Sequence, residues 1–345
     1  MTSTPTPVSL RAKPAPGRLA VTGIGNALLD VIVRDHDDLH ARLELTKGIM
    51  TLVDLERAAD IYSAMGPTIQ MSGGSVANSI AGVAALGGTS GFIGKVSDDE
   101  FGDVFAHDMR SLGVELDLAI ASRQQIATGR CHVFVSDDAQ RTMATYLGAS
   151  NQLEAEDVRE DLVARSEILY IEGYLFDLPP SKEAIRRLVA RAHEHETLVA
   201  LSLSDTFCVE RHYDDFLDLV TNDVDVLLAN EGEALALFRT PTLAAAFESV
   251  EDLGILTVVT TGPRGAEVST VHGVVHVPAA EVEDVVDQNG AGDLFASGFL
   301  YGLAVGADPV EAAALGSLCA GEVITHLGAR PEADLEELAI NAGLL

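Results

Sequence analysis

The stretch Asp287-Gln288-Asn289-Gly290-Ala291-Gly292-Asp293 decides the fold, because it places glycines and an acid before a helix-like run over residues 294–300. Glycine carries no side chain, so a Gly-Ala-Gly turn lets the backbone come close to a ligand. The first N–H groups of a helix have no partner within it, and they lie at the positive end of its dipole. Gly290, Ala291 and Gly292 therefore predict an anion site, for which phosphate is the commonest ligand.

Asp293 directly follows this predicted anion site. A carboxylate beside a bound phosphate stands where a general base for a substrate hydroxyl has to be. The same residues also fit an ordinary helix start, with a glycine turn and an acid in the first turn. A second motif is needed to choose between these two interpretations.

A second glycine-rich helix start occurs at Met71-Ser72-Gly73-Gly74-Ser75-Val76-Ala77-Asn78, and its helix is expected to end at Gly87-Gly88. Asn78 lies one turn inside that helix, where its amide can reach a ligand at the helix mouth. The two motifs, in this order and in these halves of the chain, resemble the PfkB (ribokinase-like) family of sugar and nucleoside kinases. The resemblance covers roughly residues 20–330.

The resemblance implies an α/β fold of the ribokinase-like type. This fold is a doubly wound, mainly parallel sheet with helices on both faces and a small β-sheet lid. The residue pattern from about position 166 onward agrees, because apolar strands alternate with amphipathic helices. We expect strands over 168–171, 198–201, 224–228 and 255–260, and helices over 181–195 and 231–238.

Residues 34–54 and 115–147 break this alternation and look rich in β-structure. Within the second stretch, two strand-like runs flank a predicted turn at Ser136-Asp137-Asp138. The resemblance implies that both stretches form the lid over the acceptor site and its roots. A long edge hairpin without a moving role is the alternative. Residues 1–18 predict a disordered tail, and residues 19–338 a single PfkB-type kinase domain.

The composition limits the kinds of partner. Acidic residues outnumber basic ones by 53 to 22, a net charge of −31, which opposes binding to nucleic acid or to an anionic membrane. A nucleotide site in such a chain needs backbone N–H groups, a few local arginines and a divalent ion. The 3 cysteines are scattered and fit a reducing cytosol, so we expect a cytoplasmic protein. No apolar run is long enough to predict a membrane span, and the sequence does not distinguish a monomer from a homodimer.

The acceptor site is expected at the N-terminal motif. Gly23-Ile24-Gly25-Asn26-Ala27-Leu28 begins like a dinucleotide fingerprint, but Leu28 stands where the third glycine is required. By the resemblance, Asp30 holds sugar hydroxyls with help from Asn26, although Asp30 alone could be a loop or cap residue. The further acceptor-binding residues that the resemblance implies are Gly73, Gly74, Ser75 and Asn78.

The nucleotide site has no Walker A loop with its lysine and Ser/Thr. Asn230 and Glu233 match the family's Asn-x-x-Glu motif, which implies that they organise Mg²⁺ through water, although Glu233 also fits a first-turn acid that stabilises a helix dipole. ATP is the implied donor, and the implied nucleotide-binding residues are Asn230, Thr260, Gly262, Gly265 and Gly328. An ordinary strand-to-hairpin turn is the other interpretation of 260–266.

Two further residues carry weaker expectations. Arg141 matches a lid-root arginine that can neutralise the transferring phosphate, and a solvated surface arginine is the alternative. Asp287 could join a monovalent cation site, for K⁺, beside the segment Thr325-His326-Leu327-Gly328-Ala329-Arg330. The family's usual Thr before Gly-Ala-Gly-Asp is Asn289 here, which keeps a polar side chain at that position.

The sequence predicts an ATP-dependent phosphotransferase in which Asp293 takes the proton of an acceptor hydroxyl. The stretches Gly25–Asp30, Lys47–Asp54 and Tyr170–Phe176 look more like the adenosine kinase branch, which makes the 5′-hydroxyl of adenosine the expected acceptor. Tyr174 or Phe176 could flank a purine or belong to the core. A fructokinase- or ribokinase-like sugar kinase is the alternative, and a non-catalytic nucleoside-binding sensor is a further one.

Overall fold

The structure, a computed structural model, describes residues 17–35 and 38–345, and its strands in these residues form two sheets. The large sheet has the order β14-β13-β12-β11-β10-β9-β1-β5-β6, parallel from β6 to β12 with an antiparallel hairpin at β13 and β14. Its strands are β1 (Leu19–Ile24), β5 (Ser90–Ser97), β6 (Glu115–Ala121), β9 (Ser166–Glu172), β10 (Leu198–Ser202), β11 (Val226–Asn230), β12 (Leu256–Thr260), β13 (Ala266–Thr270) and β14 (Gly273–Val277).

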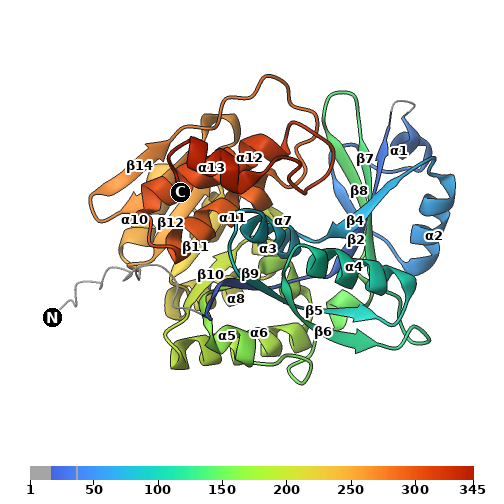
Figure 1. Cartoon of the computed structure of the whole chain (residues 1–345), viewed down its shortest axis with the longest axis horizontal. Helices are drawn as coiled ribbons and strands as arrows, with labels where there is room; N and C mark the ends of the chain where they lie inside the picture. The colour runs from blue at the N-terminus through green and yellow to red at the C-terminus, as the bar shows by residue number, and fades with distance from the viewer. Residues whose placement is uncertain (1–16, 36–37) are drawn as a thin grey trace.

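The small sheet has the order β3-β8-β7-β2-β4 and lies beside the large sheet, at the right of Figure 1. It consists of β2 (Leu28–Arg34), β3 (Met50–Leu52), β4 (Ile69–Gly73), β7 (Gly129–Val135) and β8 (Arg141–Tyr146). The prediction of a doubly wound, mainly parallel α/β fold with an additional small β-sheet is therefore confirmed.

Helices cover both faces of the large sheet, whereas α1 and α2 pack beside the small sheet. The helices are α1 (Leu39–Arg42), α2 (Leu55–Ala64), α3 (Ser75–Ala85), α4 (Glu100–Ser111), α5 (Asp161–Ala164), α6 (Pro179–Glu194), α7 (Thr206–Arg211), α8 (Tyr213–Asn222), α9 (Glu231–Phe238), α10 (Leu243–Glu251), α11 (Ala291–Ala304), α12 (Pro309–Val323) and α13 (Leu335–Asn341). Within the described residues, no helix combines the length and the apolar character that crossing a membrane requires.

The apolar strands of the large sheet are explained by burial on both faces. In β9, Leu169 and Ile171 pack with helices α5 to α10, whereas Ile168 and Tyr170 point the other way and pack with α3, α4, α11 and α12. Successive side chains of a strand face opposite sides of a sheet, so the middle of a strand that is covered on both faces is apolar at every position, as Ile168–Ile171 is in β9. This is why an uninterrupted apolar run predicted the strand correctly.

The predicted lid segments need a correction. Residues Glu115–Ala121, placed in the lid by the sequence, pair with β5 in the large sheet, with Gly91 opposite Glu115 and Ser97 opposite Ala121. The small sheet instead takes β2 and β4, most of which lie outside the predicted segments. The cause is that β6 is an edge strand with partly exposed side chains, and its pattern therefore resembles that of a lid strand. Residues 1–16 of the predicted tail lie outside the described residues.

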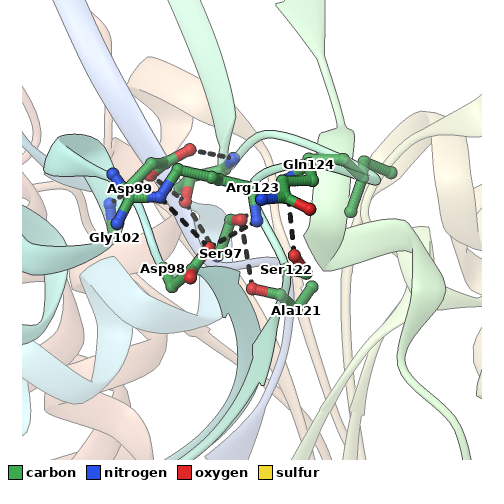
Figure 2. Close-up of polar contacts among 10 residues, drawn as sticks. Ser97, Asp98, Asp99, Gly102, Ala121, Ser122, Arg123 and Gln124 are labelled. Atoms are coloured by element: carbon green, nitrogen blue, oxygen red, sulfur yellow. Dashed lines mark hydrogen bonds and ion pairs between the residues drawn. The ribbon is translucent and has the colours of Figure 1, made fainter.

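The chain passes from the large sheet to the small one between Ala121 and β7, and Figure 2 shows the polar contacts at this junction. The Oδ1 atom of Asp99 caps α4 by accepting from the N–H of Gly102 at 2.9 Å and also accepts from the hydroxyl of Thr128 at 2.6 Å. Its Oδ2 atom accepts from the N–H of Thr128 at 2.8 Å. The hydroxyl of Ser97 donates to the carbonyl of Ala121 at 3.2 Å. Asp99 therefore connects the start of α4 to Thr128, the residue that directly precedes β7 of the small sheet.

Replacement of Asp99 by Ala should lower the free energy of unfolding by about 2–4 kcal/mol, because a helix cap is lost and N–H groups are left without a partner. Burial alone would raise the pKa of Asp99, but the hydrogen bonds from Thr128 and Gly102 lower it below its ordinary value. The stabilisation should therefore be complete above about pH 5 and disappear as the pH falls through the lowered pKa. Urea denaturation at several pH values measures this difference.

Asp54→Ala is the matched control, because exposed Asp54 caps α2 through one bond, from the N–H of Arg57 at 2.8 Å. It should cost about 1 kcal/mol or less. Equal losses for Asp54→Ala and Asp99→Ala would contradict a special role for the junction.

Candidate active site

Residues of both sheets line one cleft of about 1790 Å³ at the carboxyl ends of the parallel strands. Pockets for a single small ligand usually measure roughly 300–1,000 Å³, so this cleft has room for two ligands side by side. Most residues that the sequence assigned to a site line it: Asn26, Asp30, Gly74, Ser75, Asn78, Arg141, Asn230, Glu233, Thr260, Gly262, Gly265, Gly290, Ala291, Gly292 and Asp293. Gly73, Asp287 and Gly328 are not among the lining residues.

Asp293 lies in the first turn of α11, where it meets the start of α3. Its Oδ1 atom accepts from the hydroxyl of Ser75 at 2.7 Å, and its Oδ2 atom accepts from the amide of Asn78 at 2.8 Å. Burial raises the pKa of Asp293 above its ordinary value, although the bonds from Asn78 and Ser75 oppose the rise. A carboxylate with a raised pKa that is held by two donors is well suited to accept a proton in the cleft.

The turn before α11 has the geometry of an anion cradle. Gly290 has a φ angle of 77°, and a Cβ atom there would lie 2.6 Å from the Cβ of Ala329, so only glycine fits. Gly292, in contrast, has open space where a Cβ would stand. No side chain of the described residues caps α11, so its first N–H groups face the cleft without a side-chain partner.

Arg141 reaches this turn from the small sheet. Its Nη1 atom donates to the carbonyl of Gln288 at 3.1 Å and to the Oδ1 atom of Asn289 at 2.9 Å. The guanidinium is therefore held against the predicted phosphate cradle rather than extended into solvent. This contact also places a positive charge between the two sheets.

Asp287 is fully buried and supports the cradle from behind. Its Oδ1 atom accepts from the N–H of Asn289 at 2.8 Å, and its Oδ2 atom accepts from the N–H of Gly328 at 2.9 Å. Gly328 has a φ angle of 91° and packs against Met71, so it meets this carboxylate rather than the cleft. The segment around Gly328 thus braces the turn, and a monovalent cation at Asp287 stays a prediction.

Asp30 stands in β2 at the acceptor end of the cleft. Burial raises its pKa to about 7, opposed by the charge of Arg330 and reinforced by that of Asp293. A Cβ atom on Gly73, in the neighbouring strand, would lie 2.2 Å from the Cγ of Asp30. Gly73 therefore makes room for the carboxylate instead of lining the cleft itself.

Glu172, at the end of β9, holds the acceptor end together, although the sequence gave no reason to single it out. Its Oε1 atom accepts from the side-chain amide of Asn26 at 2.6 Å, and its Oε2 atom accepts from the N–H of Val76 at 3.0 Å. Burial raises the pKa of Glu172 to about 7. The Oδ1 atom of Asn26 is buried without a hydrogen-bond partner in the described residues, so the cleft wall carries an acceptor for a ligand N–H or O–H.

The nucleotide end lies beyond β11 and β12. Asn230 and Glu233 form a capping box at the start of α9, with the Asn230 side chain accepting from the N–H of Glu233 at 2.9 Å and the Glu233 carboxylate accepting from the N–H of Asn230 at 2.9 Å. Glu233 is therefore an acid in the first turn of α9, as the alternative interpretation held, and its carboxylate closes the cap as well. A part in holding Mg²⁺ stays a prediction. Burial raises the pKa of Glu233 to about 7.

The aromatic residues separate into core and cleft. Phe176 is buried against Phe216, with ring centroids 4.6 Å apart, and does not line the cleft, so the suggestion that it flanks a purine is wrong. Tyr174 lines the cleft and donates its hydroxyl to the carbonyl of Ser204 at 3.2 Å. Phe207, which sequence reasoning missed, lines the cleft with 70% of its surface exposed. Phe207 stands alone as an aromatic residue in the short helix α7, and no motif in the surrounding sequence indicates that such a residue lines a cleft.

The fold and the cleft define a small-molecule kinase, and the family comparison agrees: the model described as "pfkB family carbohydrate kinase" matches residues 48–335. The chain belongs to this family. It is an ATP-dependent kinase that acts on an alcohol group, and kinases of this family use ATP and Mg²⁺.

Two solved structures are similar over nearly the whole chain. A probable sugar kinase from Rhizobium etli CFN 42 is 42% identical with a TM-score of 0.90, and the match covers 95% of this chain and 99% of that one. An adenosine kinase from Sinorhizobium meliloti is 42% identical with a TM-score of 0.89, covering 94% and 100%. Among curated proteins, a 5-dehydro-2-deoxygluconokinase from Bacillus subtilis is 29% identical, covering 73% of this chain and 80% of that protein.

The two glycines of the cradle should respond differently to alanine. Gly290→Ala should lower the free energy of unfolding by about 2 kcal/mol or more, because of its positive φ angle and the contact with Ala329. Gly292→Ala should keep or raise stability by up to about 1 kcal/mol, since alanine favours the helix, yet it should reduce turnover by placing a methyl group in the cradle. Denaturation and steady-state kinetics give both values. Full turnover by Gly292→Ala would exclude an anion against this part of α11.

Proposed function

We propose that this chain is an adenosine kinase, which transfers the γ-phosphoryl group of ATP to the 5′-hydroxyl of adenosine and releases AMP. The observation that carries the proposal is the composition of the cleft lining, which combines the buried carboxylate of Asp30 with exposed apolar side chains. Asp30 can accept two hydrogen bonds from neighbouring hydroxyls, as a ribose diol presents them. The single kinase domain that performs this reaction is proposed to span residues 19–338.

The apolar part of the cleft suits a flat base. Ile49 and Leu52, from the β3 segment, line the cleft with 49% and 50% of their surface exposed, and Phe207 lines it with 70% exposed. Exposed apolar groups of this size in a cleft favour a ligand with an apolar face. A purine provides that face, whereas a free sugar does not.

The chemistry follows from the residues around α11. Asp293 takes the proton of the attacking hydroxyl, while N–H groups over residues 290–293 and the guanidinium of Arg141 stabilise the charge on the transferring phosphoryl group. Asn230 and Glu233, which line the nucleotide end, are proposed to hold Mg²⁺ through water, and their oxygen atoms suit this hard ion. Bound Mg²⁺ neutralises charge on the phosphates. The small sheet covers the acceptor and limits access of water to the phosphoryl group.

The sugar kinase alternative is supported by the comparisons, because the probable sugar kinase from Rhizobium etli is as similar to this chain as the adenosine kinase is. Asp30 would serve a sugar diol equally well. The exposed apolar side chains of the cleft lining favour adenosine over this alternative. A sensor without catalysis would not need a carboxylate held at the cradle, so the position of Asp293 argues against that alternative.

Asp293→Asn should fold normally and lower kcat by roughly 10²–10⁴, the usual contribution of a positioned general base. The KM of the acceptor should change much less, because asparagine has the same shape. Stopped assays of phosphoryl transfer with ATP and Mg²⁺ measure the effect. Asp214→Asn, at an exposed position of α8 outside the cleft lining, is the control and should keep full activity. Turnover of Asp293→Asn within a few-fold of the wild type would exclude it as the base.

Adenosine should be phosphorylated with a kcat/KM at least about tenfold above that of ribose or fructose, a difference of about 1.4 kcal/mol. Contact between the base and the aromatic ring of Phe207 contributes about 0.5–1.5 kcal/mol beyond the burial of apolar area. The measurement is a panel of adenosine, inosine, ribose, fructose and 2-keto-3-deoxygluconate.

Two variants separate recognition of the base from recognition of the diol. Phe207→Ala should raise the KM of adenosine and leave that of ribose unchanged, whereas Asp30→Ala should weaken both substrates together. If a free sugar exceeds adenosine in kcat/KM, the sugar kinase assignment replaces the nucleoside one.

A further inference from the structure

Arg330, in the loop between α12 and α13, makes a forked contact behind the catalytic carboxylate. Its Nη1 atom donates to the Oδ1 atom of Asn78 at 2.6 Å, and its Nη2 atom donates to the carbonyl and the hydroxyl of Ser72 at 2.8 and 3.0 Å. The guanidinium therefore holds β4 and α3 at once. The guanidinium is planar and only donates hydrogen bonds, so each of its partners must present an acceptor atom to it.

The contact sets the orientation of the Asn78 amide. Because Arg330 donates to the amide oxygen of Asn78, the amide NH₂ is left to face the carboxylate of Asp293, to which it donates at 2.8 Å. A flipped amide would place its oxygen against the carboxylate and its NH₂ against the guanidinium, which are two repulsive contacts. The three side chains thus form one directed chain of hydrogen bonds, from Arg330 through Asn78 to Asp293.

We infer that Arg330 is a positioning residue, which fixes the direction of the Asp293 carboxylate through Asn78. The inference rests on the proposed role of Asp293 as the general base. Asp293 does not depend on Asn78 alone, because Ser75 holds its other oxygen. Loss of the fork should therefore misdirect the carboxylate without removing it from the cleft.

The charge of Arg330 also acts on Asp293. The titratable groups that interact electrostatically with Asp293 are two guanidiniums, two carboxylates and two phenols: Arg141, Arg330, Asp30, Glu172, Tyr170 and Tyr174. Both guanidiniums lower the pKa of Asp293, while burial raises it. Removal of one guanidinium should raise this pKa further. Since the base must be ionised to act, the acid limb of the pH profile of kcat should then move to higher pH.

Two substitutions separate direction from charge. Arg330→Lys keeps the charge but cannot hold Asn78 and Ser72 together, so kcat should fall about tenfold to a hundredfold, as for a misplaced reacting group, with the acid limb unchanged. Arg330→Met removes both, so the same fall should be accompanied by an upward shift of the acid limb of about one pH unit. The KM of ATP should stay near that of the wild type in both variants.

A double-mutant cycle tests whether Arg330 acts through Asn78. If it does, Arg330→Lys should cost kcat little in a background that already carries Asn78→Ala, because the intermediate residue is gone. Additive losses in the cycle, or a wild-type kcat and pH profile in both Arg330 variants, would overturn the inference. Thermal unfolding of each variant shows whether it is folded, and should Arg330→Met not fold, Arg330→Lys still decides the cycle.

Arg18→Lys is the matched control, because Arg18, like Arg330, donates to a backbone carbonyl, that of Ser166, and it pairs in addition with Glu167, but it lies outside the cleft lining. It should leave kcat unchanged. Asp293→Asn, measured in the same series, separates the two proposals. Full turnover of Asp293→Asn refutes the base itself, whereas loss of turnover together with an additive cycle refutes the role of Arg330 alone.

Discussion

The cleft depends on the meeting of two helix starts at one carboxylate. Ser75 and Asn78 at the start of α3 hold Asp293 at the start of α11, so both helix N-termini point to the same place. The close approach continues along the helices, because a Cβ atom on Gly82 would lie 2.4 Å from the hydroxyl oxygen of Ser297. The positive ends of two helix dipoles thereby stand beside Asp293, and this arrangement suits the proposed binding of a phosphoryl group by an acidic chain.

The net charge of −31 makes the local arrangement of the few arginines important. Arg141 approaches the cradle from the small sheet, and Arg330 lies behind Asp30 and Asp293 on the opposite side. Each lowers the pKa of both carboxylates, which burial raises. Burial nevertheless remains the larger effect, so that the pKa of Asp30 is about 7 and that of Asp293 stays above its ordinary value. The net charge of the chain as a whole would repel a nucleotide.

The sequence predicted the fold, and most of the site residues it singled out line the cleft, because the features that mark them are local. A glycine turn before a helix, or an apolar run of strand length, has the same meaning wherever it occurs, which is why α9 was placed at residues 231–238 and Gly290 at a turn. The missed residues act through contacts between distant segments. Arg330 meets Asn78 across 252 positions and Glu172 meets Asn26 across 146, and no local pattern records such a contact. Residues 115–121 were misplaced for the same reason, since an edge strand does not show which sheet it joins.

The order of strands in the small sheet has a consequence for how the protein is made. The chain enters this sheet in two separate excursions, first for β2, β3 and β4 and later for β7 and β8 (Figure 1). β7 lies between β2 and β8, and it pairs with β2 from Leu28 to Arg34. During synthesis, the edge of β2 that pairs with β7 therefore stays unpaired until the residues up to Val135 have left the ribosome. The strand that carries Asp30 is one of the first to be made, but its sheet is completed only after β5 and β6 of the large sheet have been synthesised, and β8 still precedes β9 to β14. The cover of the cleft can therefore be complete in its strands before most of the large sheet beneath it.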